Sequence, residues 1–249
     1  YYMIQYSTKY RSTQSEIMDD FELKGDAMKK VLTDLKNVNK WLGGNKISIR
    51  GIVKLLPDGS KVKKITIVDL GCGDGAILRE CARFAKKAGY DFQLIGIDAN
   101  AFILEEARRR SLDYPNISFL EKDVFSTEIK ELDYDIALCT LFLHHFSTDD
   151  LKTLIQHFFD HAAIGVVIND LHRSRLAFWL FNLVSFFLIK TPIARKDGLI
   201  SVARGFKRKE LESLSQHIEN STSIISWKWA FRYSWLLKKK RDYNVTTAN

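Results

Sequence analysis

The first sixty residues have the apolar spacing of helices. Apolar side chains recur every three or four residues, which predicts a helix over residues 12–42 that the glycine pair at 43–44 would end. A shorter helix followed by a turn is expected within residues 46–60. We interpret residues 1–60 as an N-terminal helical cap.

Short β-branched runs then alternate with segments of helical spacing. The predicted strands lie at residues 65–69, 93–98, 117–120, 134–140 and 164–169. The predicted helices between them lie at residues 76–88, 101–112 and 149–161. Strand–helix–strand units require parallel strands with right-handed crossovers, so this pattern predicts an α/β domain with a mostly parallel sheet.

The alternation stops after the fifth predicted strand. The remaining expected elements are a strongly hydrophobic helix, a polar loop, a helix and two strands, at residues 173–190, 191–205, 207–219, 223–230 and 232–238. The last two strands are close enough in sequence to pair as an antiparallel hairpin. We therefore expect a single domain over residues 61–249, with a helical insertion at about 173–205.

Composition and charge narrow the class of protein. Hydrophobic residues make up 46% of the chain and charged residues 27%, as in ordinary globular proteins. The formal charge of +8 could attract nucleic acid or anionic lipid, but no basic stripe with interleaved aromatic residues accompanies it. We interpret the basic runs as solvated surface and expect no nucleic-acid partner. They are Lys61, Lys63, Lys64, Lys86, Lys87, Arg108, Arg109, Arg110, Lys238, Lys239, Lys240 and Arg241.

The cysteines and the apolar runs indicate the cellular compartment of the protein. Cys72, Cys81 and Cys139 lie far apart and form no CxxC pair, so we expect neither a metal site nor a disulfide framework. The first residues lack the apolar core of a signal peptide. The longest apolar run, residues 176–189, is shorter than the ~20 residues that span a bilayer. These features predict a soluble, cytoplasmic protein.

A glycine-rich turn and two acidic strand ends carry the candidate chemistry. Gly71, Gly73 and Gly75 lie between a buried strand and a helix, where the backbone can bend sharply against a ligand. Their G-x-G-x-G spacing differs from the G-x-G-x-x-G of dinucleotide enzymes, and such a turn could also be purely structural. However, Asp98 and Asp123 follow the next two strands, and parallel strands bring these ends to one edge. The combination predicts a nucleoside-type cofactor.

These motifs resemble those of class I S-adenosylmethionine-dependent methyltransferases. Residues 68–75 are similar to motif I of that family, and residues 96–98, 123–124 and 135–138 are similar to the motifs that follow it. The resemblance implies a Rossmann-like, seven-stranded sheet of order 3-2-1-4-5-7-6, which agrees with the expected hairpin. It implies S-adenosylmethionine as cofactor and these binding residues: Asp69, Gly71, Cys72, Gly73, Asp98, Ala99, Asp123, Val124, Thr140 and Leu141.

The resemblance also implies a role for most of these residues. Asp69 orders the turn near the methionine amino group, while Gly71 and Gly73 line the methionine portion. Asp98 holds the ribose, and Asp123 meets the exocyclic amine of adenine. The remaining residues flank the adenine ring (Ala99 and Val124) or lie beside the sulfonium (Thr140 and Leu141).

Three histidines are candidates for removing a proton from the methyl acceptor. His144 and His145 follow the fourth predicted strand, and His172 follows the fifth. Methyl transfer from a sulfonium depends on positioning and proton removal, and histidine titrates near neutral pH. His144 and His145 could equally shape the cofactor pocket, and His172 could be a loop residue hydrogen-bonded to the backbone.

The sequence favours a small apolar or aromatic acceptor. Residues 140–143 replace the Asn-x-Pro-Pro-Tyr motif of amino-methylating nucleic-acid enzymes and resemble ubiquinone/menaquinone-type methyltransferases. Residues 170–177 resemble methyltransferases of polyketide and phenolic-lipid pathways. We therefore predict an enzyme of small-molecule biosynthesis that methylates an oxygen of a phenolic, quinone or polyketide-like compound. An RNA methyltransferase and a catalytically silent S-adenosylmethionine-binding module are the alternatives.

The hydrophobic helix at residues 176–189 has several possible uses. It is apolar nearly all round, so one face must pack against something other than the sheet. It could be a substrate lid, a homodimer contact, a transient contact with a membrane surface, or core packed against the N-terminal helices through Phe21, Leu32 and Leu35.

Overall fold

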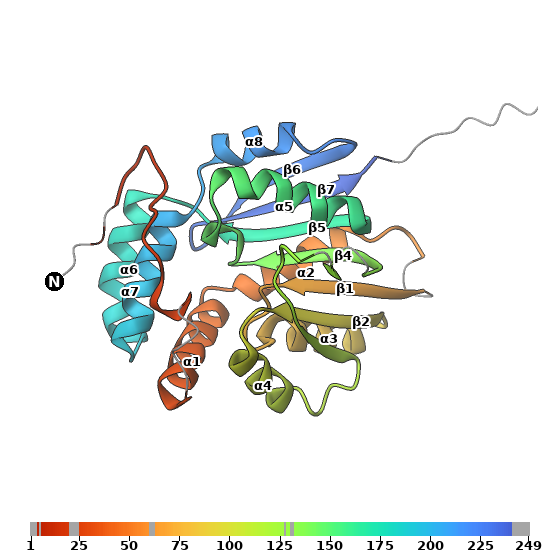
Figure 1. Cartoon of the computed structure of the whole chain (residues 1–249), viewed down its shortest axis with the longest axis horizontal. Helices are drawn as coiled ribbons and strands as arrows, with labels where there is room; N and C mark the ends of the chain where they lie inside the picture. The colour runs from red at the N-terminus through yellow and green to blue at the C-terminus, as the bar shows by residue number, and fades with distance from the viewer. Residues whose placement is uncertain are drawn as a thin grey trace, which may run out of the picture.

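A seven-stranded sheet of order β3-β2-β1-β4-β5-β7-β6 runs through the molecule (Figure 1). The computed structural model describes residues 4, 6–19, 25–59, 63–126, 128–129 and 132–240. The first five strands are parallel, and β7 pairs antiparallel with both β5 and β6. The predicted Rossmann-like sheet and its strand order are therefore confirmed.

The observed elements follow the predicted alternation of strands and helices closely. The strands are β1 (Lys64–Leu70), β2 (Asp91–Asp98), β3 (Ile117–Glu121), β4 (Tyr134–Thr140), β5 (Ala162–Leu171), β6 (Ser221–Lys228) and β7 (Arg232–Lys239). The helices are α1 (Gly25–Trp41), α2 (Gly44–Leu55), α3 (Ala76–Ala88), α4 (Ala101–Arg110), α5 (Thr148–His161), α6 (Arg175–Leu188), α7 (Pro192–Arg204) and α8 (Arg208–Gln216). Two 3-10 turns are η1 (Ile17–Asp19) and η4 (Leu143–His145).

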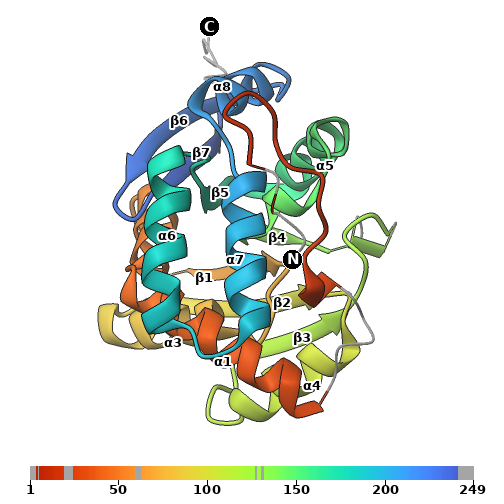
Figure 2. The ribbon, with the colours of Figure 1, turned by 90° about the vertical axis from the view of Figure 1, so that its left-hand side faces the viewer.

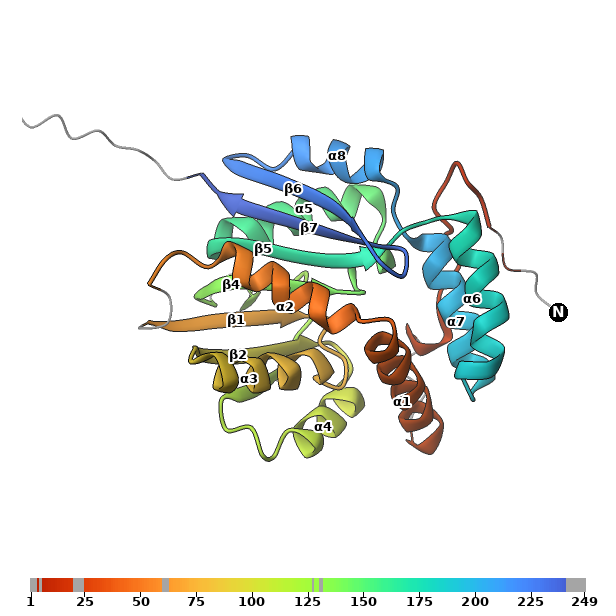
Figure 3. The same ribbon diagram turned by 180° about the vertical axis from the view of Figure 1, so that it is seen from behind.

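Helices cover both faces of the sheet, which explains the nearly continuous apolar runs of its central strands. On one face, Ile52 of α2 and Leu78 of α3 pack in one cluster with the strands (Figure 3). On the other face, Phe158 of α5 belongs to the second large cluster. Gly51 lets α2 approach closely, because a Cβ there would lie 2.6 Å from a methyl group of Val167.

Two sequence predictions were wrong in the helical segments. The predicted helix over residues 12–42 is not continuous, because residues 12–16 are irregular and α1 begins only at Gly25. The backbone N–H groups of Ile17 and Met18 donate to the carboxylate of Asp197 (2.8 and 2.9 Å), so a tertiary partner replaces the helical one. Phe21, Lys61 and Arg241, named in the sequence predictions, lie outside the described residues.

The predicted loop over residues 191–205 is the helix α7. Thr191 caps its N-terminus by accepting from the N–H of Ala194, and Pro192 occupies its first turn. The polar residues that suggested a loop are partly internal, since Asp197 is fully buried and Arg204 is nearly so.

The pair α6 and α7 stands at the carboxyl ends of the strands (Figures 1 and 2). The two helices lie side by side, and Val31 of α1 packs with Ile189 and Ala194 at their connection. Most of α6 remains exposed. No helix in the described part of the chain is long and apolar enough to cross a membrane. The divisions at residue 60 and at 173–205 stay predictions.

Candidate functional site

The glycine turn after β1 is tied to the end of β2. The N–H groups of Gly71 and Cys72 both donate to the carbonyl of Ile97 at 2.9 Å. Gly71 has φ 69° and Gly73 has φ 52°, a region that favours glycine. A Cβ on Gly71 would also collide with the ring of Phe142. Backbone conformation and close approach therefore both require glycine at position 71.

Asp98 closes this turn from the end of β2. Its Oδ2 accepts from the N–H of Gly73 at 2.9 Å, and its Oδ1 accepts from the N–H of Asn100 at 3.0 Å. Burial raises the pKa of Asp98 against the lowering effect of these hydrogen bonds. A Cβ on Gly73 would have nothing within 4 Å, so the turn is open beside the carboxylate. A ligand can therefore lie against both.

Asp69 lies beneath the turn with an unsatisfied carboxyl group. It is 1% exposed, and neither carboxyl oxygen has a hydrogen-bond partner among the described residues. Burial, and then the charge of Asp98, raise the pKa of Asp69 well above its usual range. Buried polar atoms nearly always have a partner, and leaving one unpaired is costly. The site therefore fits a ligand that brings a donor or a positive charge to this turn.

The end of β3 joins the same edge. The N–H of Lys122 donates to the carbonyl of Asp98 at 3.1 Å, which places Asp123 beside the β2 end. Asp123 is exposed and accepts from the N–H of Phe125, whereas Val124 is buried. Ala99, after β2, is exposed. The three predicted strand ends thus meet at one edge.

An aromatic row connects this edge to the end of β4. Phe125 contacts Phe146 edge-to-face, with ring centroids 5.6 Å apart. Phe146 contacts Phe142 in the same way, at 4.9 Å. Since Phe142 also covers Gly71, the row links the Asp123 segment to the glycine turn. It supplies an apolar border to the site.

Residues 140 and 141 have more specific environments than the sequence could indicate. Thr140 Oγ1 lies 2.9 Å from Ser48 Oγ of α2, so its hydroxyl is engaged by the helix. Leu141 has φ 54°, and its N–H donates to the carbonyl of Asn169 at 2.9 Å. A leucine in this region costs on the order of 1–2 kcal/mol. The strained backbone is thus held in place by β5.

Cys72, within the turn, is a buried thiol. Burial, and then the charge of Asp98, raise its pKa well above the usual range. The thiol is therefore neutral at physiological pH and unsuited to nucleophilic chemistry.

His144 lies between two buried carboxylates. Its Nδ1 is 2.7 Å from Oδ1 of Asp170, and its Nε2 is 3.4 Å from Oε1 of Glu16. Burial by itself would lower the pKa of His144, but Asp170 and Glu16 outweigh it and raise the pKa to about 9. At neutral pH the ring is therefore an imidazolium. This suits a positioning role better than that of a base.

His145 has a different pairing. Its Nδ1 is 3.1 Å from Oδ1 of Asp19, whose pKa is lowered because His145 and Arg204 outweigh the effect of burial. A carboxylate can only accept, so a neutral His145 carries its proton on Nδ1 and its lone pair on Nε2.

His172 belongs to another set of contacts. Trp227 Nε1 donates to its Nδ1 at 3.3 Å, and the ring of Tyr233 lies 5.0 Å away. Burial, and then the charge of Lys207, lower the pKa of His172, so it is neutral at pH 7. The structure thus brings His144 and His145 together and places His172 against the β6–β7 hairpin.

The sequence missed an N-terminal strap, residues 6–19, that covers the end of β4. Arg11 Nη2 and Arg204 Nε donate to the carbonyl of His144 at 2.9 and 3.0 Å. Glu16 accepts from Ser201 of α7. These partners are more than 50 residues apart in the chain, so no local pattern could have revealed them. The strap brings Glu16 and Asp19 onto the two histidines.

Glu16, His144 and His145 could in geometry hold a metal ion, since their ligand atoms lie within 4.8 Å of one another. Both ring nitrogens of His144 already face carboxylates at ion-pair distance. We therefore interpret the cluster as an ion-pair network, and the absence of a metal stays a prediction.

Comparisons with known proteins find a methyltransferase domain in this chain. Residues 67–165 match the model of a family described as a methyltransferase domain. An uncharacterized methyltransferase of Mycobacterium bovis is 29% identical over 90 residues, which is 36% of this chain and 41% of that protein. A 2-phytyl-1,4-naphtoquinone methyltransferase of Nostoc is 35% identical over 75 residues, 29% of this chain and 31% of that protein. The matches thus span less than half of these relatives.

Solved structures share the fold over more of the chain. The plantazolicin methyltransferase BpumL, in complex with a triazolic analog and SAH, superposes with a TM-score of 0.64 at 16% identity and covers 87% of this chain and 92% of that one. The magnesium protoporphyrin IX methyltransferase of Synechocystis with bound SAM has a TM-score of 0.56 at 15% identity, covering 90% and 94%. These structures share the fold of this chain, and the match of residues 67–165 to a methyltransferase domain supports the resemblance to class I methyltransferases.

Proposed function

We propose that this methyltransferase domain transfers the methyl group of S-adenosylmethionine to an oxygen of a small apolar or aromatic molecule. The observation that carries the proposal is the Asp69 carboxyl, buried without a partner beneath a turn that Asp98 clamps through Gly73. Relatives crystallised with SAM or SAH on the same fold support this choice of cofactor.

Different residues at the carboxyl edge of the sheet would hold different parts of the cofactor. Asp69 would receive the methionine ammonium, which offers the charge and the donors that this carboxylate lacks. Asp98 would accept the ribose hydroxyls, and Asp123 the adenine amine. Ala99 and Val124 would flank the adenine, and the glycine turn and residues 140–141 would border the methionine and sulfonium. When bound, the cofactor supplies an electrophilic methyl group.

We assign proton removal to His145, with Asp19 orienting it. The attacking oxygen must lose its proton as the new C–O bond forms and the C–S bond breaks. Asp19 holds Nδ1 of His145, which leaves Nε2 to take that proton. His172, whose Nδ1 lone pair is engaged by Trp227, is the second candidate.

His145→Gln is expected to lower kcat by roughly a hundredfold while leaving the affinity for S-adenosylmethionine within a fewfold, because general-base catalysis contributes 10²–10⁴. The measurement is steady-state methyl transfer across pH with cofactor calorimetry. His172→Gln is the matched control. A loss of kcat in the His172 variant alone would transfer the role to His172.

The acceptor class is inferred from the surroundings of the site. The aromatic row of Phe125, Phe146 and Phe142 borders this edge, and the apolar helix α6 stands at the same end of the sheet. One relative is named for a naphthoquinone and one neighbour is a polyketide synthase methyltransferase domain. Flat apolar acceptors suit such walls.

Cys72, Cys81 and Cys139 are free and buried, which favours work in a reducing cytoplasm.

The direct test combines binding with turnover. Calorimetry should show one S-adenosylmethionine site per chain, and label from the methyl group should reach phenols or hydroquinones in an acceptor panel. Bulk RNA serves as the competing acceptor. Labelling of RNA alone would replace this proposal with an RNA methyltransferase, and binding without any turnover would favour a silent binding module.

A further inference from the structure

The outward face of α6 is unusually apolar for a protein surface. Leu176, Trp179, Leu183, Phe186 and Phe187 are between 58% and 78% exposed. On a helix these positions fall on one side, while Ala177 and Ser185 of the opposite side are buried. Scattered exposed leucines are ordinary, but a continuous patch of this kind marks an interaction surface.

Basic groups border this face. Arg175 begins α6, and Lys190 follows it, both exposed. The guanidinium of Arg195 lies over the ring of Phe186, 5.3 Å from its centroid. In residues 173–204 the only acidic residue is Asp197, which is fully buried and bonded to the strap. The exposed charged side chains of residues 173–204 are therefore all positive.

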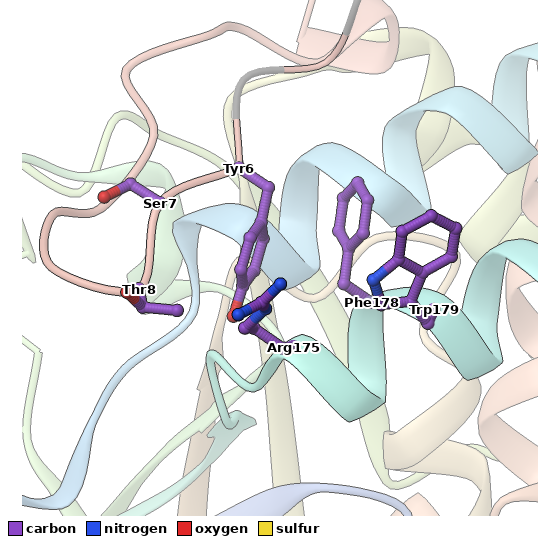
Figure 4. A pocket seen from close by; sticks show the side chains of 6 residues that line it. All are labelled: Tyr6, Ser7, Thr8, Arg175, Phe178 and Trp179. Atoms are coloured by element: carbon purple, nitrogen blue, oxygen red, sulfur yellow. The ribbon is translucent and has the colours of Figure 1, made fainter.

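A cavity opens where the strap meets the first turn of α6. It has a volume of about 440 Å³ and is lined by Tyr6, Ser7, Thr8, Arg175, Phe178 and Trp179 (Figure 4). Figure 4 shows Arg175 beside the ring of Tyr6, with Phe178 and Trp179 completing the apolar side. A cation and the hydroxyl groups of Tyr6, Ser7 and Thr8 thus line one cavity with the rings of Phe178 and Trp179. This combination suits a phosphate group attached to an apolar chain.

We propose that α6 docks on an anionic phospholipid bilayer, with its apolar face in the interface and its basic rim at the headgroups. The helix is 14 residues, about 21 Å, long, which is too short to span the ~30 Å hydrocarbon core but sufficient to lie along it. A second copy of the chain fits less well, because a two-fold contact through this face would bring the same cations together.

The docking surface goes beyond the proposed function and does not depend on it. Where both hold, an apolar acceptor would reach the enzyme from the bilayer itself. The α6–α7 pair stands at the carboxyl edge of the sheet, so the docked face and the cofactor edge lie at the same end of the molecule.

The test is co-sedimentation of the full chain with sucrose-loaded vesicles. We expect it to pellet with phosphatidylglycerol–phosphatidylcholine vesicles, far less with phosphatidylcholine alone, and less at 0.5 M salt (a concentration chosen to screen surface charge). Phe187→Asp should weaken the binding by about tenfold or more, since it puts a charge into the docked face. Leu112→Asp is the control, because Leu112 is 81% exposed but lies after α4.

Two outcomes would overturn the docking surface. One is a wild-type chain that stays in the supernatant with anionic vesicles. The other is a wild-type dimer in sedimentation velocity that Phe187→Asp dissociates while vesicle binding is absent. S-adenosylmethionine calorimetry on Phe187→Asp should match the wild type, so a failure of cofactor binding and a failure of docking are read separately.

Discussion

Asp98→Ala is expected to lower the affinity for S-adenosylmethionine by about a thousandfold. The carboxylate would lose charged hydrogen bonds to the ribose, each worth on the order of 1.5–3 kcal/mol. The N–H of Gly73 would also lose the acceptor that fixes the turn. Isothermal calorimetry with the variant and the wild type measures the change directly.

Two further variants separate the causes of that loss. Asp98→Asn keeps an acceptor for Gly73 but removes the charge, so an intermediate affinity is expected. Asp91→Ala, at the opposite and exposed end of the same strand, should bind as the wild type does. An unchanged affinity in a folded Asp98→Ala protein would defeat the assignment of the cofactor to this edge.

His144→Gln is expected to lower the free energy of unfolding by about 3–5 kcal/mol, the usual cost of removing one partner from a buried ion pair. The variant leaves Asp170 and Glu16 buried without their cation. Chemical denaturation at neutral pH gives the value. His217→Gln, on the exposed end of α8, is the matched control and should change the stability little.

The pH dependence gives this prediction a second readout. The folded pKa of His144, about 9, lies above its ordinary value of 6.5, so its contribution is fully present below pH 6.5 and is lost as pH rises through about 9. Between pH 6.5 and 8.5 the wild type should lose roughly 2–3 kcal/mol that the variant does not lose. Above that range the buried thiols, whose pKa values are raised, add a slope of the same sign.

A wild-type stability that stays constant from pH 6.5 to 8.5 would show that His144 is not held as an imidazolium. In the acid range the sign reverses. The pKa values of Asp170 and Glu16 are lowered because His144 outweighs their burial, so their contributions are lost as pH falls below their ordinary values.

The edge that we propose for the cofactor could be located from the sequence, because the residues that form it are local and recur at the ends of successive strands. Ile67, Val68 and Leu70 mark β1 as a strand buried on both faces, and the glycines after it announce the turn. The parallel register of β1 and β2 then places Asp98 at the turn, because Asp69 pairs with Gly96 and Asp98 lies two residues further along β2. Each step needs only neighbouring residues and the geometry of a parallel sheet.

The helix α7 and the strap could not be predicted in the same way. Their polar residues are satisfied by partners far along the chain, as Asp197 is by Ile17 and Met18. A prediction from apolar periodicity treats such polar residues as exposed. The segment of α7 was therefore predicted to be a loop. The same cause made the helix over residues 12–42 too long, because backbone groups that a helix would use are bonded to α7.

The sequence by itself determined the alternation of strands and helices, the glycine turn and the acidic strand ends, because these follow from patterns within a few residues. The sheet order was implied by the resemblance to class I methyltransferases. The tertiary structure decided the charge of His144, the pairing of His145 and the exposure of α6. Each of these depends on which segments, distant in the chain, lie next to one another in the fold. Burial and electrostatic interactions depend on neighbours in space, and the spacing of residues along the chain does not reveal those neighbours.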